Sequence, residues 1–290
     1  MSLVLTLVSR SNDVAQLAKA APGASGDIAE LSGGGWQVAE RAVSGGAELV
    51  AWLDAEAHRL AVDWAVTPAV NRRKKLLISD MDSTIIGQEC LDELADFAGR
   101  KAEVSAITER AMRGELDFAG ALTQRVAMLK GLGLQALETC YRERISLNPG
   151  ARELVATMKT HGARTVLVSG GFRYFTSRVA AMAGFDADRA NTLADDGKSL
   201  TGDVGRPILG REAKLAALQE ETAALGGAPV DAVAMGDGAN DLDMIRAAGL
   251  GVAYKAKPIV AADTRARIQH TDLRAALFFQ GYRVDEIVGA

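Results

Sequence analysis

Short apolar runs separated by polar and glycine-containing segments set the pattern of the chain after residue 75. Three of them are "LLIS" at 76–79, "RTVLVS" at 164–169 and "DAVAMG" at 231–236. Each run is followed by glycine or aspartate and then by a helical pattern, which is typical of buried strands in a parallel sheet. The pattern therefore predicts an α/β fold with a Rossmann-like parallel sheet and helices on both of its faces.

A long helical stretch, from about 88 to 148, separates the first two runs. It contains the segments "ECLDELADFAG", "VSAITERAMRG" and "DFAGALTQRVAMLKGL", and the last of these begins at Asp117, a suitable N-cap residue. Because the insertion follows the first core strand directly, we expect it to form a helical cap over the end of the sheet. Further on, "ANTLADDGKSLTGDV" (190–204) predicts two short strands joined at Asp196-Gly197, a hairpin signal.

The first 70 residues follow a different pattern and predict a small α+β domain. Strands are expected at "LVLTLVS" and "GWQVAERAV", and helices at "DVAQLAKAA", beginning at Asp13, and at "AELVAWLDAEAHRLAVD". The glycine-containing "PGASGD" and "SGGG" predict loops. "TPAVNRRKK" at 67–75 predicts the linker to a second domain, residues 71–290. The first domain contains no catalytic constellation.

Composition excludes several classes of protein. The net charge of −4 with both signs interspersed indicates neither a nucleic-acid footprint nor a membrane-binding patch. No apolar run approaches the ~20 residues of a membrane-spanning helix, and no basic segment precedes the apolar N-terminus, so a signal peptide is not expected. Two cysteines cannot form a disulfide framework. We therefore expect a cytoplasmic protein that binds neither nucleic acid nor membrane.

Polar residues follow each of the three apolar runs. Asp80 and Asp82 come after the first, Ser169-Gly170-Gly171 ends the second, and the segment from Asp237 to Asp241 follows the third. The carboxyl ends of parallel strands meet at one edge of a sheet, where open α/β sheets bind their ligands. These residues therefore predict a functional site at that edge.

The chemistry of these side chains suits phosphoryl transfer. Asp80, Asp237 and Asp241 are hard oxygen donors for Mg²⁺ or Mn²⁺, and Lys214 in "REAKLAALQ" adds a positive charge. With the backbone amides of "SGG" they describe a phosphoryl cradle. An aspartate is ionised at neutral pH and can attack phosphorus without an activating base. A second one, Asp82, can transfer the protons.

Each motif also has an ordinary structural interpretation. "DMDST" alone is compatible with a plain turn, glycine turns after strands are common, and a single helical lysine is usually solvated. "GDGAND" is more specific, since three acidic or amide side chains among glycines rarely serve only as a turn. All four motifs occur in order, each after the expected element, and this combination favours the functional interpretation.

These four motifs resemble those of the haloacid dehalogenase superfamily. "NRRKKLLISDMDSTII", "DDGKSLTGDV" and "GDGANDLDMIRAAGLGVAYKAKP" are similar to the phosphoserine phosphatase family within it, over about residues 71–275. The resemblance implies Mg²⁺-dependent hydrolysis of O-phospho-L-serine, a small phosphomonoester, to L-serine and phosphate. The reaction would pass through a phospho-aspartate and complete L-serine biosynthesis.

The resemblance also implies roles for individual residues. Asp80 would be the nucleophile and Asp82 the general acid/base. Magnesium would bind the Asp80 carboxylate, the Asp82 carbonyl and Asp237, with Asp241 supporting the site. The residues that would surround the phosphoryl group are Ser169, Gly170, Lys214 and Asn240.

Substrate choice would rest on the cap, where the family pattern falls on Glu89, Met112, Phe118 and Arg125. The i, i+4, i+7, i+11 spacing of Phe118, Leu122, Arg125 and Leu129 places Arg125 within an apolar stripe. A guanidinium there needs an anionic partner. Either a substrate carboxylate or an internal salt bridge with a cap glutamate would meet this need, while Glu89 would face a substrate ammonium.

Two other functions remain open at this point. The same chemistry would serve a phosphotransferase that passes the phosphoryl group to another hydroxyl, such as that of homoserine. A retired hydrolase scaffold would serve as a phosphate or amino-acid sensor, although the retained aspartates disfavour this. Longer bacterial members of the family carry an ACT-like regulatory domain. For residues 1–70 we keep such a role, homodimerisation and a purely structural role as alternatives.

Overall fold

One twisted sheet joins the N-terminal residues to the central part of the protein in the computed structural model, which describes residues 2–113 and 115–289, without the side chain of Met112. Among these residues the sheet has ten strands. In spatial order they are β2 (Ala24–Glu30), β3 (Gln37–Val43), β1 (Leu3–Ser9), β4 (Asp63–Pro68), β12 (Ala266–Ile268), β11 (Leu250–Tyr254), β10 (Ala232–Gly236), β5 (Leu76–Ser79), β6 (Arg164–Phe172) and β7 (Ala187–Asn191).

The three apolar runs form neighbouring parallel strands at the centre of this sheet, as predicted. β5 lies between β10 and β6, and all four of its residues are buried. Alternate residues contact opposite helical layers: Leu77 belongs to the larger core cluster, and Leu76 and Ile78 belong to a second cluster. Burial on both faces explains why the runs are apolar throughout.

Helices cover both faces of the parallel part. α7 (Ala151–Thr160), α8 (Arg173–Ala183) and α12 (Ala275–Phe279) pack on one face, while α9 (Arg211–Ala224) and α10 (Leu242–Ala247) pack on the other. The short α11 (Pro258–Ala261) follows β11. The predicted α/β class with helices on both faces is confirmed.

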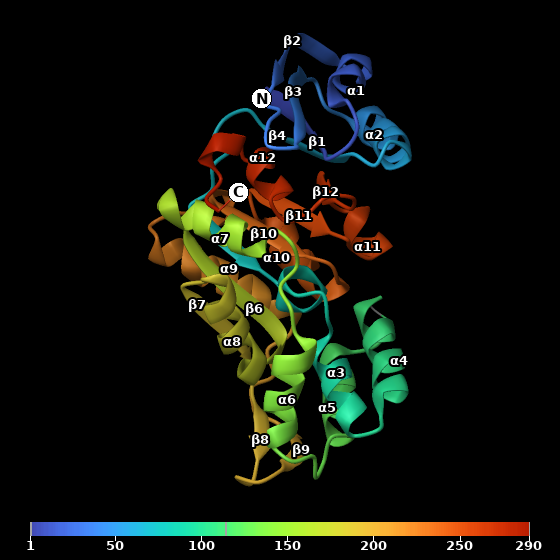
Figure 1. The fold of residues 1–290 in the computed structure, drawn as a ribbon, viewed down its shortest axis with the longest axis vertical. Coiled ribbons are helices and arrows are strands. Elements are labelled where there is room, and N and C mark those ends of the chain that lie inside the picture. The colour runs from blue at the N-terminus through green and yellow to red at the C-terminus, as the bar shows by residue number, and fades with distance from the viewer. Residues whose placement is uncertain (1, 114, 290) are drawn as a thin grey trace.

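A helical cap stands at the far end of the molecule from the N-terminus (Figure 1). It consists of α3 (Cys90–Phe97), α4 (Lys101–Met112), α5 (Phe118–Ala127) and α6 (Gln135–Arg144). The Asp117 side chain caps α5 by accepting a hydrogen bond from the Gly120 amide. The predicted hairpin is also present, as β8 (Leu193–Asp195) and β9 (Leu200–Val204), and its backbone bonds the α5–α6 loop.

The N-terminal unit combines β1–β4 with α1 (Val14–Ala20) and α2 (Ala47–Arg59) around a core cluster of its own. Asp13 caps α1 as expected, through the Ala15 amide. The predicted "PGASGD" loop is wrong from Ala24 onward, because β2 begins there. β2 is an edge strand with mostly exposed residues and a register shift after Ser25, so it shows no apolar alternation.

The N-terminal unit joins the rest of the protein through the sheet itself. β4 pairs antiparallel with β12, with Ala65 opposite Ala266, and the Asp63 carboxylate accepts hydrogen bonds from three successive amides, those of residues 269–271. Strands from both sides of the predicted boundary near residue 70 therefore belong to one continuous sheet. The first two residues of the predicted linker, 67 and 68, belong to β4.

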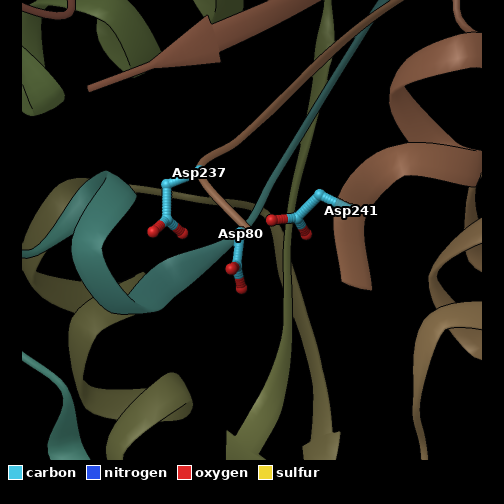
Figure 2. A group of neighbouring side chains, drawn as sticks. All are labelled: Asp80, Asp237 and Asp241. Carbon is cyan, nitrogen blue, oxygen red and sulfur yellow. The ribbon is translucent and has the colours of Figure 1, made fainter. Parts of the chain in front are cut away.

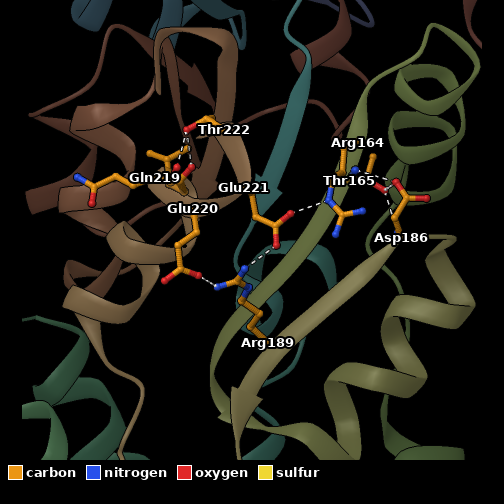
Figure 3. Close-up of polar contacts among 9 residues, drawn as sticks. Arg164, Thr165, Asp186, Arg189, Gln219, Glu220, Glu221 and Thr222 are labelled. Atoms are coloured by element: carbon orange, nitrogen blue, oxygen red, sulfur yellow. Dashed lines mark hydrogen bonds and ion pairs between the residues drawn. The ribbon is translucent and has the colours of Figure 1, made fainter. Parts of the chain in front are cut away.

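A charged cluster fastens α9 to the opposite edge of the sheet (Figure 3). Glu221 of α9, with a side chain only 8% exposed, accepts from Arg164 of β6 and Arg189 of β7, both at 2.6 Å. Burial alone would raise the pKa of Glu221, but the hydrogen bonds from both arginines outweigh it and lower the pKa.

None of the helices in the described part of the chain has the length and apolar character that a bilayer-spanning segment needs.

Candidate active site

Three carboxylates meet at the carboxyl edge of the parallel strands, as the sequence predicts. Asp80 follows β5, Asp237 follows β10, and Asp241 directly precedes α10. One oxygen of each lies within 4.8 Å of the others (Figure 2). All three are nearly inaccessible to solvent. Gly236 makes the approach possible, since a Cβ there would lie 2.3 Å from Cγ of Asp241.

Burial and mutual repulsion perturb this cluster strongly. Burial, followed by the charge of Asp241, raises the pKa of Asp80 well above its usual range, and the same two causes raise the pKa of Asp237 to about 7. The Asp237 Oδ1 atom is buried and has no hydrogen-bond partner among the described residues. Converging hard oxygens with an unpartnered lone pair fit a divalent cation such as Mg²⁺ or Mn²⁺.

Lys214 enters the cluster from α9. Its Nζ lies 2.7 Å from Oδ1 of Asp80 and 2.6 Å from Oδ1 of Asp241. Burial disfavours the ammonium, but Asp241 and Asp80 overcome it and raise the pKa of Lys214. The lysine therefore stays charged, and it partly balances the carboxylates without a metal.

Asp82 occupies the turn after β5, beside the cluster. Its Oδ1 accepts from the Cys90 amide at 2.8 Å, and its Oδ2 accepts from Ser169 Oγ at 3.2 Å. Burial raises the pKa of Asp82. The next residue, Ser83, adopts a positive φ of 55°, which turns the chain away from the sheet immediately after the carboxylate.

The Ser169-Gly170-Gly171 segment leaves little free space around it. A Cβ on Gly170 would lie 2.5 Å from the Phe118 ring, and one on Gly171 would lie 3.0 Å from Asp82 Oδ2. Asn191, at the end of β7, donates to the Gly170 carbonyl at 2.8 Å, a contact that the sequence did not predict. Nothing in its local sequence distinguishes Asn191 from a loop asparagine.

Residues of the cap line the site together with residues of the core. Glu89, Phe118 and Arg125 line a cavity of about 30 Å³ together with Asp80 and other residues of the core. Glu89 accepts from Ser83 Oγ at 2.6 Å, and burial raises its pKa well above the usual range. Asn240 lines the same cavity, and its Oδ1 has no partner among the described residues. The predicted Met112 side chain lies outside the described part.

Arg125 is buried within the apolar stripe of α5, as its spacing predicts. In the described part of the chain, no carboxylate forms an ion pair with its guanidinium. Its Nη1 instead donates to Thr108 Oγ1 at 2.8 Å, and its Nε donates to the Ala121 carbonyl at 3.2 Å. The alternative interpretation of Arg125, an internal salt bridge with a cap glutamate, is therefore wrong for the described residues.

Known proteins are similar to this chain in sequence. The family model of haloacid dehalogenase-like hydrolases matches residues 77–246. A phosphoserine phosphatase of Polaromonas sp. is 52% identical over 191 residues, which cover 64% of this chain and 81% of that protein.

Solved structures extend the comparison to the fold. A crystal structure of a HAD family hydrolase from Salmonella enterica superposes with a TM-score of 0.85 at 28% identity, covering 96% of this chain and 98% of that one. A structure described as a phospho-aspartyl intermediate analogue of phosphoserine phosphatase has a TM-score of 0.68 at 39% identity. It covers 71% of this chain and 99% of that one.

Proposed function

Since the chain belongs to the haloacid dehalogenase-like hydrolases, and within them to the phosphoserine phosphatase family, we propose that it hydrolyses O-phospho-L-serine to L-serine and phosphate. The observation that carries the proposal is that Asp80 shares one cavity with Glu89 and Arg125 of the cap. A phosphoryl site that faces one anionic and one cationic group matches a ligand with a phosphate, an ammonium and a carboxylate.

Asp80 is the proposed nucleophile. Its Oδ1 accepts from the Met81 amide at 2.8 Å and pairs with Lys214, so the carboxylate is oriented before substrate arrives. An Asp80 oxygen attacks phosphorus, the bond from phosphorus to the serine oxygen breaks, and Asp82 gives its proton to that oxygen. The raised pKa of Asp82 supports this role, because it increases the protonated fraction near neutral pH.

The second half-reaction uses the same two side chains. A water molecule attacks the phosphorus of the phospho-aspartate, and Asp82 takes the proton that the water loses. The bond between phosphorus and Asp80 then breaks, which releases phosphate and restores both carboxyl groups. The products are thus L-serine and phosphate, and the enzyme is unchanged.

The phosphoryl group is proposed to bind between Ser169, the Gly170 backbone, Lys214 and Asn240. We propose Mg²⁺ as the cation, held by the Asp80 carboxylate, Asp237 and the Asp82 carbonyl, with Asp241 supporting the site. When bound there, it neutralises charge on the phosphoryl oxygens.

The cap is proposed to select the substrate. Arg125 would bind the carboxylate of the substrate, Glu89 would bind its ammonium, and Phe118 would pack beside its side chain. The cavity between cap and core measures about 30 Å³, and we propose that the cap moves away to admit a phosphoamino acid. The buried, free cysteines Cys90 and Cys140 support a reducing, cytoplasmic setting.

Phosphate release from a panel of phosphorylated amino acids and sugars, with MgCl₂, tests the proposal. We expect O-phosphoserine to be the preferred substrate, and Asp80→Asn to abolish turnover and the hydroxylamine-sensitive phosphoenzyme. Asp243→Asn makes the same chemical change outside the carboxylate cluster, at an ion pair with Arg211, and should retain activity. Near-normal turnover in Asp80→Asn, or preference for another phosphomonoester, would refute the assignment. Adding an alcohol acceptor tests for phosphotransfer.

A further inference from the structure

A buried chain of hydrogen bonds crosses the cap beside the proposed substrate site. It links Asp92 of α3, Thr108 of α4 and Arg125 of α5. Thr108 Oγ1 lies 2.6 Å from Asp92 Oδ1 and 2.8 Å from Arg125 Nη1. The three residues are 8%, 4% and 4% exposed, so water contributes little to satisfying them. Three helices thus meet at one threonine hydroxyl.

The direction of these bonds follows from the single proton of the hydroxyl. A guanidinium only donates and a carboxylate only accepts, so Thr108 must accept from Arg125 and is free to donate to Asp92. The Val104 carbonyl is a second acceptor within reach, at 3.1 Å, but the Asp92 contact is shorter and charge-assisted. Thr108 therefore relays the negative charge of Asp92 to the arginine.

The contact through Thr108 lets Asp92 stabilise the buried positive charge of Arg125. Burial lowers the pKa of Arg125, and Asp92 is the strongest of the carboxylates that oppose this effect, ahead of Glu89 and Asp82. A carboxylate in direct bidentate contact would occupy the donors that a substrate carboxylate needs. Asp92 instead acts through Thr108 on one nitrogen, Nη1, while Nε is held by a neutral carbonyl.

We propose that Thr108 and Asp92 are positioning residues that hold the Arg125 guanidinium toward the substrate carboxylate and thereby set the affinity for carboxylate-bearing phosphomonoesters. The inference rests on the proposed function, in which Arg125 binds that carboxylate. The N–H donors of Arg125 are then already oriented before the substrate binds, so the enzyme need not reorient a flexible side chain at each binding event.

Thr108→Val tests this by replacing the hydroxyl with a methyl group of similar size. For O-phosphoserine we expect KM to rise about tenfold, the size of one hydrogen bond to a charged group, while kcat stays within about twofold. For phosphoethanolamine, which lacks the carboxylate, kcat/KM should change less than about twofold. Thr108→Ser keeps the hydroxyl and should restore the KM for phosphoserine.

Thr123→Val is the matched control. Thr123 lies on the same helix as Arg125, but it is exposed, and among the described residues its hydroxyl bonds only the Ala119 carbonyl. The kinetics of Thr123→Val should therefore match those of the parent. Asp92→Asn keeps the shape and removes the charge, and should raise the KM for phosphoserine selectively. It decides the question if Thr108→Val does not fold.

Equal losses on both substrates in the Thr108 or Asp92 variants would overturn the inference and leave the pair as packing residues. Failure of the proposed function gives a different result. In that case the parent would not prefer phosphoserine over phosphoethanolamine, or Arg125→Ala would leave the ratio of the two kcat/KM values unchanged. A selective loss in Arg125→Ala without one in Thr108→Val would refute the positioning role alone.

Discussion

Asp237→Asn should make the metal-free protein more stable at neutral and alkaline pH, although it removes a proposed metal ligand. Asp237 is buried beside Asp241, and its Oδ1 has no hydrogen-bond partner among the described residues. Without a divalent cation, Lys257 and Lys214 compensate its negative charge only in part. An asparagine of nearly the same shape removes that charge, so the apo protein should gain free energy of unfolding.

The magnitude follows from the pKa of Asp237, which rises from 3.8 to about 7 on folding, first because of burial and then because of Asp241. Below the unfolded pKa both states hold the proton, and the carboxyl costs nothing. Between pH 4 and 7 only the unfolded state releases it, so parent stability falls as pH rises. Above pH 7 the full cost is on the order of 4 kcal/mol. We expect asparagine to recover roughly half, since its buried amide must also leave water.

Urea denaturation of the parent and Asp237→Asn at pH 5 and 8, in EDTA and in MgCl₂, measures this effect. In EDTA the variant should exceed the parent by about 2 kcal/mol at pH 8 and by less at pH 5. In saturating Mg²⁺ the parent should gain about 2.7 kcal/mol at a hundredfold excess over Kd, and the variant little. Asp243→Asn, which removes an ion pair with Arg211, should not gain stability. A variant less stable than the parent in EDTA at pH 8, or one with the full Mg²⁺ response, would refute the reasoning.

Two further changes test packing and charge elsewhere. A Cβ on Gly210 would lie 3.0 Å from the Phe118 ring, so Gly210→Ala should displace the ring and lower kcat/KM for phosphoserine by up to about tenfold. Gly133→Ala is the control and should not lower kcat/KM, because a Cβ there would meet no atom closer than 4.0 Å. Equal kinetics in the two variants would contradict this prediction. Glu221→Gln should lower stability at pH 7 by about 1–3 kcal/mol, because it weakens two charged hydrogen bonds. Since the folded pKa of Glu221 is lowered, this difference should shrink as pH falls through the unfolded pKa of 4.5 toward the lowered folded pKa. A difference in urea midpoint that is as large at pH 3 as at pH 7 would argue against the charge effect.

The parts of the fold that sequence predicts best are those with one dominant physical cause. β5, β6 and β10 are buried on both faces, so their apolar runs identify them. The ends of parallel strands coincide, so the approach of Asp80 to Asp237 could be anticipated from order alone. β2 escaped prediction because an edge strand has no buried face to impose a pattern.

The cap separates what local spacing can predict from what it cannot. Helical periodicity placed Arg125 in a buried stripe, and the structure confirms that burial. The contacts of Arg125 depend on how α3, α4 and α5 pack, and Asp92 and Thr108 are 16 residues apart in sequence. No motif marks such a pair, because each member alone is an ordinary helical residue.

The pairing of β4 with β12 has a consequence for solubility. Without β4, the short, largely buried β12 would present unpaired backbone groups at the border of the sheet, a template for association between copies. With the N-terminal unit in place, the outer strands are β2 and β7. β2 is mostly exposed, irregular in register and carries Asp27, and β7 carries Asp188 and Arg189. The N-terminal unit therefore covers the edge of β12 and leaves β2, a charged strand of irregular register, as the edge of the sheet on that side. Such an edge disfavours aggregation by strand addition.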